Sequence, residues 1–350
     1  MKYCAITPCA INVIDDEMWR MDALKRLVLR QLPRRYSAPS VAYVYHPKLT
    51  TIEADKQSLE WTKTVQLNHM PESIEKCLEA VDGTKWSQRL SSAILQSKGY
   101  ESPETDRTDP DYVYGVIQNL VRGLFAVHPE QMKSNHVTWD PFLAASWQRN
   151  GTNYAIRGKT SIIMSSKHPI PNHFSQQFVE ESSNTELPSV WPIDTTIDLS
   201  RQSLVKERFS TCAHEGTSFP HLHTVFVLYQ QPLTDAQIIQ KGVCLTFARL
   251  LAQARCSASN LLHSPLPGQC IATNGKKFTF FYYQLNTLDL DTDTGIKNLV
   301  HIVGPHLLYR KLKKKGGRKV VVDLNEQAVK LLIATLTNHQ PVDSLPTTDV

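Results

Sequence analysis

Two Asn-Gly turns constrain the fold more than any other feature of the chain. Asn274-Gly275 joins Cys270–Thr273 to the strongly β-prone run Lys277–Leu285 (KFTFFYYQL), and Asn150-Gly151 lies between strand-like, aromatic flanks. Asn-Gly is preferred at the centre of tight hairpin turns, because both residues tolerate positive φ. The sequence therefore predicts two antiparallel hairpins, and a patterned aromatic strand such as Lys277–Leu285 is expected in a core or at a partner interface.

Amphipathic helices are predicted mainly before residue 130. The apolar residues that follow Pro71 recur at i, i+3, i+4 and i+7, which places them on one face of a helix. Further helices are expected over Ile52–Leu67, around Trp86–Ile94 and from Tyr112 to Leu124. Residues 37–130 are therefore predicted to form a mainly helical part.

Residues 131–337 combine helix and strand patterns in one predicted body. Thr234-Asp-Ala-Gln237 is a capping box, and it opens a long helix that runs to Ala254. His223–Tyr229 is a candidate buried strand. The predicted fold class is α+β, with a mainly helical N-terminal part followed by a mixed β-sheet part with a long packed helix. The other predicted features are a strand over Lys319–Leu324, a helix over Asn325–Thr337, surface connections over 165–220 and a frayed tail over 338–350.

Residues 1–36 have the composition of a mitochondrial presequence region. From Met21 the chain reads MDALKRLVLRQLPRRYSAPS, in which five bases accompany one acid and apolar residues recur near helical spacing. A cationic amphipathic helix is typical of mitochondrial import signals, although an ordinary basic helix is the alternative. Arg34-Arg35-Tyr36-Ser37 resembles a matrix-peptidase site, with cleavage expected after its tyrosine. Because Asp15-Asp16-Glu17 is foreign to a presequence, we expect translation to start at Met21.

The positive charge of the chain is concentrated in one segment. The formal net charge is +5, but outside residues 1–36 the chain holds 31 basic against 29 acidic residues. Seven of those 31 bases fall within Arg310–Lys319, and the rest of the body has a net charge of −5. A protein that coats nucleic acid along its length is basic throughout, since affinity follows the number of phosphates neutralised. This pattern indicates one basic arm on a slightly acidic body.

The basic arm is the segment predicted to contact RNA. The sequence predicts a loop over residues 310–319, with its bases on both sides of Gly316-Gly317. A flexible loop of this charge density can lie along a phosphate backbone without reading bases, and a solvated loop without a ligand is the alternative. The residues predicted to bind RNA are Arg310, Lys311, Lys313, Lys314, Lys315, Arg318 and Lys319.

Two clusters of potential metal ligands have spacings that argue against a metal site. Cys212–His223 holds one cysteine and three histidines as C-x-H-x6-H-x-H, whereas zinc ligands usually pair two to four residues apart. The aspartates of Asp289-Leu-Asp-Thr-Asp293 resemble the start of a calcium loop, but Thr294 stands where the turn glycine belongs. We therefore expect a polar turn rather than a calcium site, and no metal.

Composition and motifs exclude several classes of protein. No stretch approaches 18 consecutive apolar residues, so no membrane span is expected. The seven cysteines are scattered without a CxxC pair, which is typical of reduced thiols in a cytosol-like or matrix-like compartment. The chain has no phosphate-binding glycine loop, no HExxH and no GxSxG. We expect no enzyme, no catalytic residue, no cofactor and no small-molecule substrate.

Six segments resemble, in the same order, segments of a family of mitochondrial ribosomal proteins. The most telling one contains the run FFYYQLNT and, shortly after it, Lys-Asn-Leu. The family includes large-subunit protein thirty-seven and its sister, which is called programmed cell death protein nine or small-subunit protein thirty. The resembling segments are Leu59–Thr64, His168–Pro171, Ile197–Leu199, Pro220–Thr224, Phe247–Arg255 and Phe278–Tyr309.

The resemblance spans roughly residues 41–312 and favours the large-subunit member. It implies a structural protein of the mitochondrial ribosome in the matrix, bound to large-subunit ribosomal RNA and to neighbouring large-subunit proteins that include the sister family member. It implies no catalysis and no cofactor. Under this reading, Gln284, Asn286 and Thr287 satisfy a strand end rather than touch a substrate. Two other classes stay open on the residues alone: a matrix metallo-hydrolase that uses the Cys212–His223 cluster, and a mitochondrial RNA-binding regulator outside the ribosome.

Overall fold

In the computed structural model, the described residues of the protein form an α+β fold. The predicted presequence region, residues 1–36, lies outside the described residues, and so do Ile197–Leu199 and residues 340–350. The described residues are 40–45, 55–97, 110–187, 200–205, 210–211, 217–230, 232–256, 262, 264–315 and 318–339.

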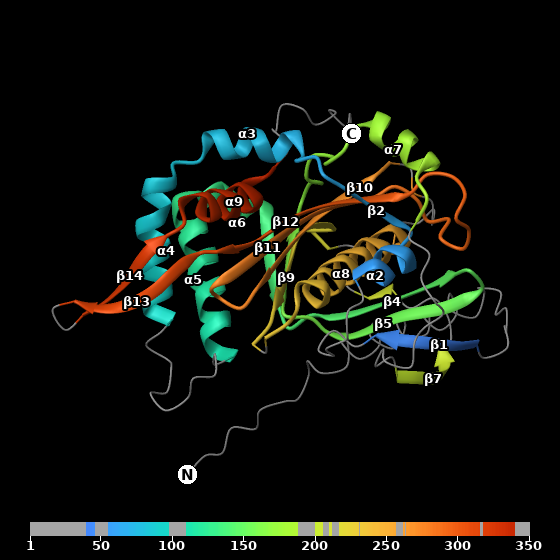
Figure 1. Ribbon diagram of the computed structural model, residues 1–350, viewed down its shortest axis with the longest axis horizontal. Helices are drawn as coiled ribbons and strands as arrows, with labels where there is room; N and C mark the ends of the chain where they lie inside the picture. The colour runs from blue at the N-terminus through green and yellow to red at the C-terminus, as the bar shows by residue number, and fades with distance from the viewer. Residues whose placement is uncertain are drawn as a thin grey trace, which may run out of the picture. The chain divides into compact units, whose positions relative to one another are not determined.

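A seven-stranded mixed sheet forms the centre of the fold (Figure 1). Strand β2 runs parallel to β12 and β9 runs parallel to β10, whereas the other neighbouring strands are antiparallel. This order places β11 and β10 inside the sheet, with at least two strands on either side. The strands in spatial order are β2 (Thr64–Leu67), β12 (Asn298–Leu307), β11 (Lys277–Leu285), β10 (Leu266–Thr273), β9 (His221–Leu228), β6 (Ile162–Ser166) and β3 (Asn135–Trp139).

Strand β11 is apolar on both faces because both faces of the sheet are covered. Its even-numbered aromatic residues, from Phe278 to Tyr282, join one cluster of buried side chains. The odd-numbered residues from Phe281 to Leu285 join the other cluster, as the two-residue period of a strand requires. Full burial of one such side chain contributes about 1.5–3 kcal/mol of transfer free energy. The expectation that this run belongs to a core or an interface is thus resolved in favour of the core.

Helices cover the even-numbered face of β11 (Figure 1). Their buried apolar residues form one cluster with Phe226 of β9 and Ile271 of β10. The last helix is capped by Asn325, whose Oδ1 accepts hydrogen bonds from the backbone N–H groups of Gln327 and Ala328. The helices of this layer are α3 (Glu72–Ala80), α4 (Gly83–Ser97), α5 (Pro110–Val127) and α9 (Glu326–Thr337), and the short α6 (Pro129–Ser134) follows α5.

The predicted long helix, α8 (Asp235–Cys256), lies on the other face, between this sheet and a second one (Figure 1). The predicted capping box is confirmed: Gln237 N donates to Thr234 Oγ1 at 3.2 Å, and Thr234 N donates to Gln237 Oε1 at 3.0 Å. Gly242 lets the helix approach β11 closely, since a Cβ there would lie 2.4 Å from Cζ of Phe281. The absence of a side chain at this position therefore sets the distance between α8 and the sheet.

The second sheet has five strands and contains the other predicted hairpin. Asn150 has φ 49° and Gly151 has φ 72°, so both turn residues have the positive φ that tight hairpin turns require. β4 and β5 pair antiparallel on either side of this turn, and β1 runs parallel to β5. Both predicted Asn-Gly hairpins are therefore confirmed. The strands in spatial order are β7 (Ser200–Val205), β1 (Ser40–Tyr45), β5 (Thr152–Lys159), β4 (Phe142–Arg149) and β8 (Ser210–Thr211).

Three sequence-based expectations are corrected. The predicted helix Ile52–Leu67 is α2 (Asp55–Trp61) followed by β2, because Lys63 has φ 48° and the next residues pair with β12. The tail does not fray from Asn338, which is 1% exposed and whose side-chain amide donates to Gln269 Oε1 at 3.0 Å. Where it is described, the predicted connection 165–220 contains α7 (Gln176–Glu181), η2 (Ser182–Asn184), β7 and β8.

Candidate nucleic-acid interface

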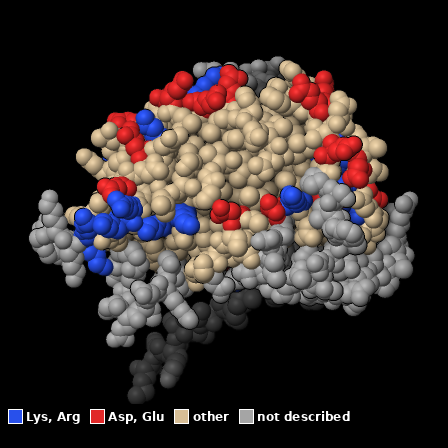
Figure 2. All heavy atoms as spheres, in the orientation of Figure 1, with Lys and Arg blue, Asp and Glu red and all other residues tan. Residues whose placement is uncertain are grey.

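The predicted basic loop is a β-hairpin. Strand β13 (Tyr309–Lys315) pairs antiparallel with β14 (Arg318–Leu324), and their register sets Lys311 opposite Val322 and Lys313 opposite Val320. The expectation of a loop is corrected because the three valines after the bases supply a β-prone partner for the lysine-rich strand. Figure 2 shows Lys and Arg side chains gathered over this hairpin.

The hairpin divides its residues between two faces. Leu312 and Val321 are paired across the strands, and both pack against the buried cluster beneath the helical layer. Because side chains alternate along a strand, Lys311 and Lys313 lie on the opposite face, where both are exposed. The apolar face thus holds the hairpin on the body and presents the lysine face to solvent.

The base of the hairpin is joined to the core by hydrogen bonds. Leu308 N donates to the carbonyl oxygen of Lys276 at 2.8 Å, and Asn325 N donates to the carbonyl oxygen of Leu308 at 2.8 Å. The hydroxyl groups of Tyr309 and Tyr112 lie 2.8 Å apart in a buried contact between β13 and α5. These contacts fix the direction in which the hairpin leaves the body.

Few carboxylates oppose the bases of the hairpin. Among the side chains that the structure describes, the hairpin has one ion pair, between Arg310 and Asp323 at 3.7 Å, and both residues are more than half exposed. An exposed pair of this kind contributes about 0–1 kcal/mol and leaves the charge available to a stronger ligand. Of the predicted RNA-binding residues, Arg310, Lys311, Lys313 and Lys319 are exposed, and Lys314, Lys315 and Arg318 occupy the ladder positions next to the turn.

Two lysines that the sequence analysis missed lie at the base of the hairpin. The Nζ of Lys276 is 5.8 Å from the ring centroid of Tyr309, and the neighbouring Lys277 is exposed and pairs with Leu307 of β12. They precede the basic segment by more than thirty residues, and β12 returns alongside β11 to bring them together. If the pairing of β12 with β11 had been predicted from the sequence, these two lysines would have been expected beside the basic segment.

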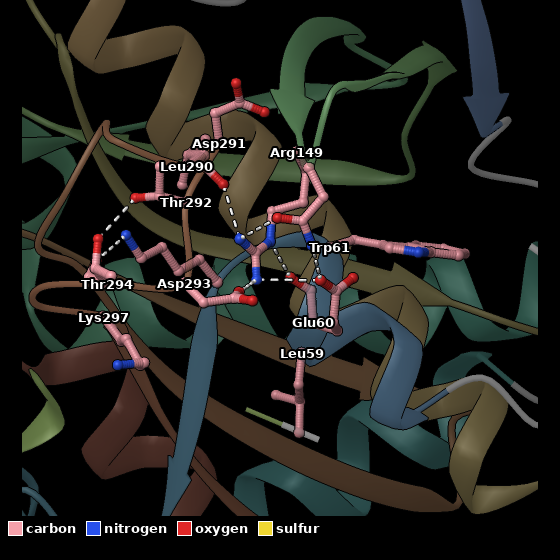
Figure 3. A network of polar contacts seen from close by, with 12 residues as sticks. Leu59, Glu60, Trp61, Arg149, Leu290, Asp291, Thr292, Asp293, Thr294 and Lys297 are labelled. Atoms are coloured by element: carbon pink, nitrogen blue, oxygen red, sulfur yellow. Dashed lines mark hydrogen bonds and ion pairs between the residues drawn. The ribbon is translucent and has the colours of Figure 1, made fainter. Parts of the chain in front are cut away.

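A second set of bases is buried inside the protein, where Arg149 is surrounded by acceptors (Figure 3). Its Nε donates to the carbonyl oxygen of Glu60 at 2.9 Å, and its Nη1 donates to the carbonyl oxygen of Leu290 at 3.1 Å. Its Nη2 forms ion pairs with Asp293 and, at 3.1 Å, with Glu60 Oε1. Burial raises the pKa of Glu60, although Arg149 opposes that shift. This arginine therefore connects α2, β4 and the loop after β11.

Two buried lysines hold the same loop. Lys63 donates to the carbonyl oxygens of Asp289 at 2.9 Å and Thr294 at 2.7 Å, and burial lowers its pKa. Lys297 donates to the carbonyl oxygens of Ser182 at 3.0 Å and Gly295 at 3.2 Å. The aspartate-rich loop, which superficially resembles a calcium loop, is thus bound by cations that belong to the chain itself.

Four of the family-like features meet at this place. Asn298 Oδ1 accepts hydrogen bonds from Asn286 N at 2.8 Å and Thr287 N at 3.2 Å, and its Nδ2 donates to the carbonyl oxygen of Thr62 at 2.8 Å. The hydroxyl groups of Thr64 and Tyr283 are 2.6 Å apart. The Trp-Thr-Lys-Thr, aromatic-strand, Gln-Leu-Asn-Thr and Lys-Asn-Leu segments therefore satisfy one another's buried polar groups. Capping of the strand end by Gln-Leu-Asn-Thr is what the resemblance implied.

The histidines considered as zinc ligands are separated by their contacts. Cys212 and His214 lie outside the described residues. His221 Nδ1 lies 3.4 Å from Nε2 of Gln253, whereas His223 is fully buried with its ring 4.8 Å from that of His339. Burial lowers the pKa of both His221 and His223. Across the described part of the chain, no three His, Cys, Asp or Glu side chains form a possible metal site.

Comparisons with known proteins match this chain to ribosomal proteins. The family described as "Mitochondrial 28S ribosomal protein S30 (PDCD9)" matches residues 229–340. The large ribosomal subunit protein mL37 of Rattus norvegicus is 30% identical over 299 residues, which cover 80% of this chain and 70% of the relative. The mL37 proteins of Bos taurus and Gallus gallus are 28% and 27% identical; the matches cover 80% and 76% of this chain and 70% and 65% of the relatives.

These relatives define a class, that of the mitochondrial ribosomal proteins. Four of the features that resemble the family in sequence meet in the interior, and the bases of Arg310–Lys319 belong to the β13–β14 hairpin. Within that class, the chain belongs to the family of large ribosomal subunit protein mL37. The resemblance stated from the sequence is therefore confirmed. In addition, no helix within the described ranges is both long and apolar enough to cross a membrane.

Proposed function

We propose that the protein is a structural constituent of the large subunit of the mitochondrial ribosome and acts in mitochondrial translation within the matrix. The observation that carries the proposal is the 30% identity to an mL37 protein across 80% of the chain. The segments that resemble the family also form one interior network, in which the buried polar groups of one segment are satisfied by those of the others.

The same network supports a structural role rather than catalysis. Asn286, Thr287 and Asn298 bind one another and the neighbouring backbone inside the protein, where they satisfy the ends of β11 and β12. A buried group that is committed to several hydrogen bonds is expensive to release for chemistry on a substrate. The family-like polar residues therefore serve the fold.

Ribosomal RNA is the proposed ligand of the β13–β14 hairpin. Lysines on an exposed strand face, with little carboxylate opposition, can neutralise phosphates and release their counterions. Such contacts position a protein on RNA without reading its sequence. Neighbouring large-subunit proteins are the proposed partners of the slightly acidic remainder of the body. The sister family member is one of these proposed neighbours.

The test of the ribosomal assignment is sedimentation of detergent-lysed mitochondria through a density gradient, with and without ribonuclease. The protein should migrate with the large subunit and the complete ribosome, and it should move to the top after ribonuclease. A pool that stays at the top regardless of ribonuclease would contradict the assignment. It would favour the regulator or the metallo-hydrolase that the sequence left open.

The test of the hairpin is charge reversal. Replacement of Lys313, Lys314 and Lys315 with Glu should reduce incorporation into the large subunit several-fold, because three phosphate contacts become repulsions. A matched control changes the same amount of charge elsewhere, at the exposed residues Lys56, Lys85 and Arg89. Equal incorporation of both variants would mean that protein neighbours, rather than the hairpin, hold the protein in the subunit.

A further inference from the structure

The lysines at the base of the hairpin continue the row of charges on its exposed face. Lys311 and Lys313 are two positions apart on β13, which corresponds to roughly 6.8 Å in a strand. Tyr309 occupies the next position of that row, but it is 4% exposed and cannot itself reach a ligand. The ammonium group of Lys276 lies over the Tyr309 ring and supplies a positive charge at that position.

A second lysine extends this row away from the hairpin. Lys277 follows Lys276 directly and is exposed at the start of β11, where it pairs with Leu307. The backbone hydrogen bond from Leu308 to Lys276 ties this turn to the residue immediately before β13. The positions of Lys276 and Lys277 relative to the hairpin are thus set by the core, not by flexible chain.

The side chains on this surface favour double-helical over unpaired nucleic acid. Proteins that hold unpaired strands offer exposed aromatic rings on which bases stack. The single aromatic residue among the described residues of the hairpin is Tyr309, and it is buried with its hydroxyl group beside that of Tyr112. A row of lysines without an exposed ring can neutralise phosphates but cannot hold bases by stacking.

We infer that Lys276 and Lys277, together with Lys311 and Lys313, form one track that binds the phosphate backbone of double-helical RNA without sequence preference. The inference rests on the proposed function, because it takes RNA as the ligand of the hairpin. It adds two binding residues from a different part of the chain and names the form of the RNA. The track begins at the β10–β11 turn and runs along the lysine face of β13.

The experiment measures binding of the full chain to a fluorescent RNA duplex of about 16 base pairs as the salt concentration is raised. Replacement of both Lys276 and Lys277 with Gln should lower the slope of log affinity against log salt by about one to two units and weaken binding about tenfold near 0.15 M salt. The matched control is the Lys56→Gln, Lys85→Gln pair, which removes the same charge from exposed sites elsewhere. Thermal unfolding of each variant verifies that the fold is retained.

The outcomes separate this inference from the proposed function. A lower slope for the Lys276 and Lys277 variant, with no change for its control and equal affinity for duplexes of different sequence, supports the track. If replacement of Lys311 and Lys313 with Gln lowers the slope but the Lys276 and Lys277 variant does not, the extended track is overturned while the hairpin stands. If neither variant lowers the slope, the RNA contact of the hairpin is overturned as well. Tighter binding to the unpaired strand than to the duplex would overturn the duplex assignment.

Discussion

Buried and exposed lysines and arginines have opposite roles in this protein. Arg149, Lys63 and Lys297 are at most 2% exposed and donate to carbonyl oxygens of the loop that follows β11. Lys311 and Lys313 are exposed and form none of the ion pairs among the described side chains. A base whose hydrogen bonds are already satisfied in the interior stabilises the fold, whereas a base without a partner can bind a ligand. Residue type alone does not distinguish the two groups; burial and partners do.

The largest expected effect concerns acid, which acts on buried polar groups and not on exposed lysines. Burial lowers the pKa of His173 to about 3 and that of His339 to about 4. In the unfolded chain the pKa returns to about 6.5, so between about pH 6.5 and 4 the unfolded state binds more protons than the folded state. Above about pH 6.5 both states hold these histidines neutral, so the free energy of unfolding does not depend on them. Below about pH 6.5 it decreases by about 1.4 kcal/mol per pH unit for each histidine, until the pH reaches the pKa of that histidine in the folded state. Urea unfolding across this pH range measures the slope.

A substitution of His339 tests how much of this pH dependence of stability comes from that histidine. His339→Gln keeps a donor for Gln131, whose Oε1 is a partner of the His339 ring. It should reduce the pH dependence by about one proton, because one of the depressed groups is removed. The same slope in the variant would show that His339 is not a source of the acid sensitivity.

The next effect tests the buried arginine. Arg149→Leu removes the donor to Glu60, Asp293 and the carbonyl oxygen of Leu290, and it should lower the free energy of unfolding by about 3–5 kcal/mol. Arg310→Leu is its counterpart at the surface and should change stability by no more than about 0.5 kcal/mol. Equal effects of the two substitutions in denaturant titrations would remove the distinction between the two groups of bases.

The smallest expected effect on stability is tested by comparing a buried lysine with an exposed one. Lys63→Met leaves the carbonyl oxygens of Asp289 and Thr294 without their donor and should cost about 1–3 kcal/mol of stability. Lys311→Met should cost less than about 0.5 kcal/mol, yet it should weaken binding to RNA. Paired unfolding and RNA-binding measurements on both variants test the separation. A Lys63 variant that loses RNA affinity while its stability is unchanged would contradict it.

Much of the fold could be predicted because its signals are local. The two Asn-Gly turns, the Thr234–Gln237 capping box and the periodicity of α8 each depend on residues within a few positions of one another. Strand β2 was missed because its conformation depends on pairing with β12, more than two hundred residues away. Non-local pairing overrides a weak local helix preference, and a single sequence carries no direct record of it.

The sequence by itself determined the concentration of bases in residues 310–319, the aromatic strand and the family, since these follow from residue identity and order. Only the tertiary structure decided which bases are free. It placed Lys63 and Arg149 against carbonyl oxygens of a loop far away in the chain, and it brought Lys276 beside Tyr309. The physical reason is that availability to a ligand depends on solvent exposure and on the hydrogen bonds already made. Both are set by segments that meet only when the chain is folded.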